Sequence, residues 1–120
     1  MEANIMNMVR SVSNTRTYMP DEKVFNEGSP GNTMYVVIDG HVEISVAGRL
    51  IEVAGPGSIV GEMALIDSCN RSATVVAKDN CILAQVNESE FLSLMEKTPL
   101  FGLNVMKILV TRLRNMDGLI

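Results

Sequence analysis

The chain has 120 residues, 47% of them hydrophobic, and this size suits one domain with a core of its own. Its net charge is -4, and its few basic residues are scattered, which argues against nucleic-acid binding. The first residues lack the long apolar run of a signal peptide or a membrane span. The two cysteines, Cys69 and Cys81, fit reduced thiols, so we expect a cytoplasmic chain that does not insert into membranes.

The predicted elements begin with a short helix in residues 1–14, where Ile5, Val9 and Val12 share one face. From residue 15 to residue 87 we expect about eight short strands, rich in Val, Ile, Thr and Tyr and separated by turn residues. Strands this short and evenly spaced are typical of an antiparallel sandwich or barrel.

The pattern becomes helical again in residues 88–120. Asn87 is expected to cap the first of two helices, with Glu90 as its partner in a capping box. Pro99 ends that helix or begins the next one. The second helix is predicted to be amphipathic, with five apolar residues on one face: Leu103, Met106, Leu109, Val110 and Leu113.

The segment 60–77 is largely apolar, yet it contains Glu62 and Arg71, nine residues apart. A buried charge without a partner costs several kcal/mol. The two charges therefore lie at the surface, pair with each other, or await a ligand.

A single helical turn is predicted to start at Gly61, with its free N–H groups at Glu62, Met63 and Ala64 forming an anion site. Arg71 follows at the start of the next strand, where its planar guanidinium suits a phosphate. A carboxylate beside a bound anion suggests that Glu62 accepts a hydrogen bond from a hydroxyl, such as a ribose 2′-OH. These groups together describe a site for a sugar phosphate with a free hydroxyl.

The same residues form a known pattern. Residues 60–65 read aliphatic-Gly-Glu-any-small-aliphatic, and residues 71–73, after a five-residue spacer, read Arg-small-Ala. This arrangement resembles the phosphate-binding cassette, here residues 60–74, of cyclic nucleotide-binding domains. The family includes the catabolite activator protein and the regulatory subunits of cAMP-dependent kinase. An upstream pattern, in which Val24 is followed by Gly28, an apolar run and Gly40, also matches it.

The resemblance implies a mainly β fold with flanking helices. The expected core is an antiparallel β jelly-roll (double-stranded β-helix) barrel, with a short N-terminal helix and C-terminal helices in the same domain. It also implies a regulatory domain that binds cAMP or cGMP as a ligand, needs no cofactor, and moves its C-terminal helices on binding.

The resemblance assigns a role to each cassette residue. Glu62 would accept a hydrogen bond from the ribose 2′-OH, Arg71 would neutralise the cyclic phosphate, and Ser72 would offer a hydroxyl to the phosphate or the base. Backbone groups of three small residues would complete the cradle: Gly61, Ala64 and Ala73.

The sequence also bears on two other functions, an enzyme and an interaction module. An enzyme is not indicated, because the single His41 cannot supply the histidine cluster of a cupin-type metal site. A module of the same fold that lost its ligand and mediates interaction or dimerisation stays an alternative, although Glu62 and Arg71 favour the sensor. The expected partners are a cyclic nucleotide and a second copy or an effector in the same or another chain, but not DNA. Three methionines are interpreted as core residues: Met63, Met95 and Met106.

Overall fold

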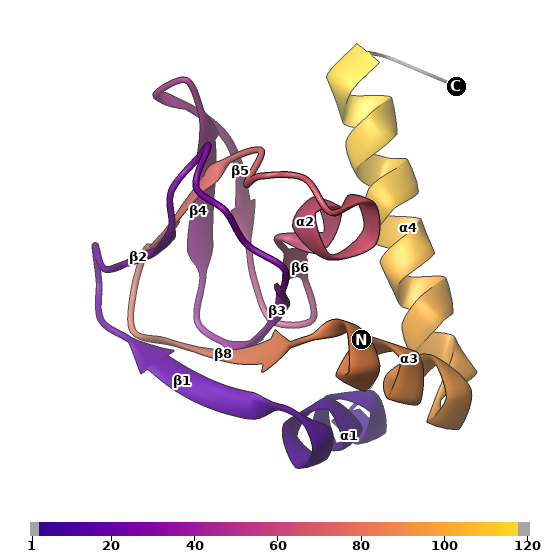
Figure 1. The fold of residues 1–120 in the computed structure, drawn as a ribbon. Helices are drawn as coiled ribbons and strands as arrows, with labels where there is room; N and C mark the ends of the chain where they lie inside the picture. Colours follow the sequence, from indigo (N-terminus) through magenta and orange to yellow (C-terminus); the bar gives the residue numbers. More distant parts are fainter. Residues whose placement is uncertain (1–2, 118–120) are drawn as a thin grey trace.

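Two four-stranded antiparallel sheets face each other, and helices pack along one side of them (Figure 1). The structure is a computed structural model and describes residues 3–117. Its elements are α1 (Ala3–Val12), β1 (Asn14–Tyr18), β2 (Lys23–Phe25), β3 (Met34–Asp39), β4 (Val42–Val46), β5 (Arg49–Ala54), β6 (Ile59–Val60), α2 (Glu62–Asp67), β7 (Thr74–Ala77), β8 (Cys81–Val86), α3 (Glu88–Lys97) and α4 (Pro99–Asp117). The predicted run of short strands between flanking helices is confirmed.

The strand order is β1-β8-β3-β6 in one sheet and β2-β7-β4-β5 in the other. Strands that follow each other in the chain, such as β7 and β8, lie in different sheets, so the chain passes repeatedly from one sheet to the other. This is the jelly-roll arrangement that the sequence predicts. The division of the chain at residues 14/15 and 87/88 stays a prediction.

Strand β3 shows how the core is divided between two layers. Met34 and Val36 point toward the helices and pack in one buried cluster with Phe101 of α4. Tyr35 and Val37, on the opposite face, pack in a second cluster between the two sheets. Because successive side chains of a strand alternate between faces, a strand buried on both faces reads as one continuous apolar run.

Local signals place the helices as expected. The Asn87 side chain accepts a hydrogen bond from the Glu90 N–H at 2.8 Å, and the Glu90 side chain accepts one from the Asn87 N–H at 2.9 Å, which completes the capping box. Helix α3 ends at Lys97, and α4 begins at Pro99. No helix within residues 3–117 is both long enough and apolar enough to cross a membrane.

Helix α4 leaves most of its predicted apolar face uncovered. Phe101 and Val105 are buried against the sheet, whereas four apolar residues of the predicted face are exposed: Leu103, Met106, Val110 and Leu113. The helix packs against the roll along the stripe that starts at Phe101, and α3 covers its first turns, where the rings of Phe91 and Phe101 meet. The interpretation of Met63, Met95 and Met106 as core residues is therefore wrong, since each is at least 37% exposed.

Candidate functional site

The short helix α2 starts at the predicted position, after Gly61. Gly61 has a φ of 78°, in the left-handed region, which costs a residue with a Cβ about 1–2 kcal/mol. No side chain forms a capping hydrogen bond with the backbone N–H groups in the first turn of α2. The turn buries Glu62 and Ala64 and leaves Met63 on the outer surface.

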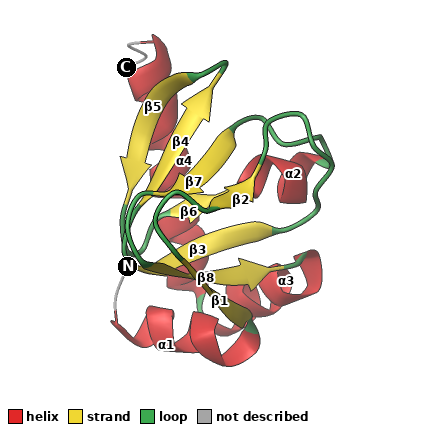
Figure 2. Ribbon diagram, turned by 90° about the vertical axis from the view of Figure 1, so that its left-hand side faces the viewer, coloured by secondary structure: helices red, strands yellow, loops and turns green. Residues whose placement is uncertain are grey.

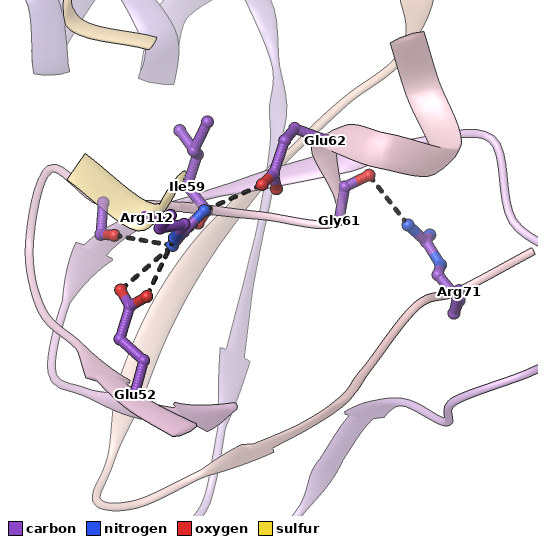
Figure 3. A network of polar contacts seen from close by, with 7 residues as sticks. Glu52, Ile59, Gly61, Glu62, Arg71 and Arg112 are labelled. Carbon is purple, nitrogen blue, oxygen red and sulfur yellow. Dashed lines mark hydrogen bonds and ion pairs between the residues drawn. The ribbon is translucent and has the colours of Figure 1, made fainter. Parts of the chain in front are cut away.

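Arg71 is a buried cation, only 6% exposed. Its Nη1 donates to the carbonyl oxygen of Thr33 at 2.6 Å and to that of Gly61 at 3.3 Å. Its Nη2 donates to the Thr33 hydroxyl at 3.2 Å, while its Nε is buried without a hydrogen-bond partner. The bond to Gly61, drawn in Figure 3, joins the two halves of the cassette.

No carboxylate within residues 3–117 forms an ion pair with Arg71. The guanidinium instead lies against an aromatic ring, with its Cζ 4.2 Å from the ring centroid of Phe25. Burial away from water lowers the pKa of Arg71 from its ordinary value. The site thus contains a desolvated positive charge that carbonyl dipoles and a ring stabilise in place of a counter-ion.

Glu62 is buried as well, at 7% exposed, but its partner is a different arginine. Its Oε1 accepts a hydrogen bond at 2.9 Å from Nη1 of Arg112, which lies on α4. Glu62 and Arg71 are therefore neither at the surface nor paired with each other, and the pairing of Glu62 with Arg112 is an outcome that the three alternatives from the sequence did not include.

Arg112 connects α4 to the roll at several points (Figure 3). Its Nε and Nη2 donate to the two carboxylate oxygens of Glu52 in β5, at 2.9 and 3.2 Å. Its Nη2 also donates to the Ile59 carbonyl oxygen at 2.6 Å and to the Ser58 hydroxyl at 3.4 Å. Figure 2 shows α4 passing behind the strands of this sheet on the β5 side.

Sequence reasoning did not identify Arg112, Glu52 or Thr33 as part of this site. A signal for Arg112 was present, because it continues the helical spacing of the stripe on α4 that Phe101 and Val105 bury. A charged residue in line with a buried stripe indicates an oppositely charged residue on the surface against which the helix packs.

Two further predicted site residues, Ser72 and Ala73, directly follow Arg71 in the chain. Ser72 is exposed and Ala73 is half-buried, just before β7 begins at Thr74. The Arg71 N–H donates to the Ser29 carbonyl oxygen at 2.9 Å, which ties the second half of the cassette to the loop before β3. Within the described part of the chain, no three His, Cys, Asp or Glu residues cluster as metal ligands would.

The pattern of these residues matches a known family. The family model described as "Cyclic nucleotide-binding domain" matches residues 15–98. The chain belongs to the cyclic nucleotide-binding domain family. The family is one of ligand-binding regulatory domains, and its members share the jelly-roll fold described above.

This cyclic nucleotide-binding domain is similar in sequence and in fold to parts of several longer proteins. The cyclic AMP receptor protein of Thermus thermophilus is 33% identical over 107 residues, which are 85% of this chain and 50% of the receptor. Isozyme 2 of a cGMP-dependent protein kinase of Drosophila melanogaster is 31% identical over 83 residues, which are 69% of this chain and 8% of the kinase. The crystal structure of the Thermus thermophilus catabolite activator protein superposes with a TM-score of 0.80 at 30% identity, over 98% of this chain and 57% of that one. The domain thus spans about half the length of the receptor that it matches.

Proposed function

We propose that this domain is a sensor that binds cAMP or cGMP through its cassette and changes the position of its C-terminal helices in response. Arg71 would bind the cyclic phosphate, Glu62 the ribose 2′-OH, and Ser72 the phosphate or the base. Backbone groups of the small residues would line the cradle: Gly61, Ala64 and Ala73. The exposed Met63 would contribute only its N–H.

One observation carries this proposal: Arg71 is a buried cation without an ion-pair partner among residues 3–117. A buried charge that has no counter-ion is costly, so a fold keeps it where a ligand supplies the missing charge. The buried Nε without a partner is a further donor that an anion could engage after a small rotation of the side chain.

The test is calorimetry of cAMP and cGMP against the wild type and two variants, Arg71→Ala and Arg49→Ala. Hydrogen bonds to a charged group contribute about 1.5–3 kcal/mol, so Arg71→Ala should weaken binding about tenfold to a hundredfold. Arg49 is an exposed arginine at the start of β5, and its loss should leave the affinity unchanged.

A thermal shift provides an independent measurement, since a ligand at 100 times its dissociation constant stabilises the native state by about 2.7 kcal/mol. An unchanged affinity in Arg71→Ala would contradict the assignment of the phosphate site. Absence of binding by both nucleotides to the wild type would contradict the sensor itself.

A second candidate is an interaction module that works through α4. Four exposed apolar residues follow one another at spacings of three, four and three: Leu103, Met106, Val110 and Leu113. This is the a/d spacing of a coiled-coil seam, which favours a second copy of the chain as partner. Sedimentation with and without nucleotide separates the candidates, because a pure interaction module dimerises to the same extent in both. A cytoplasmic location, the lack of DNA binding by this chain and the lack of enzymatic activity stay predictions.

A further inference from the structure

Strand β2 contains a bulge that turns Phe25 toward the interior of the roll. Lys23, which is exposed, pairs with Val76 of β7. Phe25 pairs with Val75, the preceding residue of β7, so two steps along β2 oppose one step along β7. In a regular strand, residues two apart point to the same face, and Phe25 would face outward with Lys23, but a bulge re-aims the side chain. Phe25 instead packs against the buried cluster between the two sheets, to which Val75 belongs.

Two aromatic rings approach the guanidinium of Arg71. Its Cζ is 4.2 Å from the ring centroid of Phe25 and 5.9 Å from that of Tyr35, and the two centroids are 5.9 Å apart. The cassette closes the same space, because a Cβ added to Gly61 would lie 2.6 Å from Nη1 of Arg71 and 3.2 Å from Cε2 of Phe25. The ring and the guanidinium therefore meet at the glycine that precedes α2.

The groups that hold this guanidinium are electrically neutral. Two carbonyl oxygens and the Thr33 hydroxyl accept its hydrogen bonds, and no carboxylate within residues 3–117 forms an ion pair with it. The face of an aromatic ring attracts a cation through its quadrupole but does not neutralise it. A carboxylate in the place of the ring would compete with a phosphate for Arg71, whereas the ring leaves the positive charge available.

We propose that Phe25 is a positioning residue for the phosphate: its ring holds Arg71 in the binding position by a cation–π interaction and leaves the charge free for the ligand. This inference rests on the proposed function and adds to it a residue of β2, outside the cassette. Phe25 acts through Arg71 and not through a contact with the nucleotide. Without the ring, Arg71 occupies the binding position for only part of the time, and the apparent affinity falls by that fraction.

The experiment replaces Phe25 with phenylalanines that carry one, two or three ring fluorines, which nearly keep the shape of the ring and progressively weaken its attraction for a cation. Calorimetry with whichever of cAMP and cGMP binds more tightly should show a stepwise loss of affinity toward about threefold to thirtyfold, the range of a cation–π interaction. Phe25→Leu, which removes the aromatic ring, should show a loss in the same range. The matched control is the same fluorine series at Phe91, whose ring packs edge-on against Phe101, and it should leave the affinity unchanged.

A double-mutant cycle separates positioning of Arg71 from simple packing of the ring. In Arg71→Ala, Phe25→Leu should weaken nucleotide binding no further, because no cation is left to hold. If the ring only packed in the core, Phe25→Leu would weaken binding equally with and without Arg71. NMR of the ligand-free protein adds a measurement that does not depend on binding. The ring current of Phe25 should move the side-chain proton signals of Arg71 upfield, and Phe25→Leu should abolish that shift.

A constant affinity across the fluorine series at Phe25 overturns the inference, and so does an equal loss in Phe25→Leu with and without Arg71. Unshifted Arg71 signals in the wild type would show that the ring does not hold the guanidinium, which overturns it as well. These outcomes differ from failure of the proposed function, in which the wild type binds neither nucleotide.

Discussion

Two glycines lie directly against the guanidinium of Arg71, and replacing them tests whether this position of the arginine matters. A Cβ added to Gly61 would lie 2.6 Å from Nη1 of Arg71, and one added to Gly31 would overlap Nε of Arg71. Separations this short require the arginine to move. Both substitutions to alanine should therefore displace Arg71 from the Thr33 carbonyl oxygen that it binds.

Gly48 provides a control with the same backbone strain. Gly48 and Gly61 both have a φ of 78°, but a Cβ on Gly48 meets no atom within 4 Å. Gly48→Ala should therefore cost only the strain of the left-handed conformation, about 1–2 kcal/mol. Gly31 has no positive φ, so Gly31→Ala should lower the free energy of unfolding only through the displacement of Arg71.

The expected losses follow from these separate contributions. Displacing Arg71 removes at least one hydrogen bond of a charged group, about 1.5–3 kcal/mol, which is the loss expected for Gly31→Ala. Gly61→Ala combines both contributions and should lose about 2.5–5 kcal/mol. Urea unfolding of the three variants measures these differences directly from the transition midpoints.

Nucleotide affinity provides the second measurement. Gly31→Ala and Gly61→Ala should weaken cAMP binding about tenfold or more, and Gly48→Ala should leave it within about twofold. Equal destabilisation by Gly48→Ala and Gly61→Ala would refute the reasoning, because the contact with Arg71 would then contribute nothing. Wild-type affinity in Gly31→Ala would show that the described position of the guanidinium does not matter for binding.

Two further predictions concern groups outside the site. Burial raises the pKa of the Cys81 thiol, so a water-soluble thiol reagent at pH 8 should modify the half-buried Cys69 and spare Cys81 until the chain unfolds; equal rates in the native protein would contradict this. Two hydrogen bonds lower the pKa of Asp79 below its ordinary value of 3.8. The larger effect comes from the His41 ring and the smaller from the His41 backbone N–H. The stability that these bonds contribute is complete above the ordinary pKa of Asp79 and is lost as the pH falls through its lower pKa in the folded state. Below about pH 4, the urea midpoint should therefore decline less in Asp79→Asn than in the wild type.

The elements with local causes could be predicted from the sequence. The Asn87–Glu90 capping box, the break at Pro99 and the turn at Gly61 each depend on residues at most a few positions apart, so their geometry is encoded in a short window. The strands were predicted from short runs rich in Val, Ile, Thr and Tyr between turn residues, and these signals are local as well. The cassette residues were found for the same reason, since they lie within fifteen positions of one another.

The partners of the buried charges were decided by the tertiary structure alone. Glu62 pairs with Arg112, 50 residues away, and Arg71 donates to Thr33, 38 residues away. No local pattern encodes such pairs, because any of several arginines could neutralise a carboxylate until the folded chain brings one of them within reach. The exposed face of α4 has the same origin: its apolar spacing predicts a face that needs a partner, but only the packing of Phe101 and Val105 decides which side meets the roll.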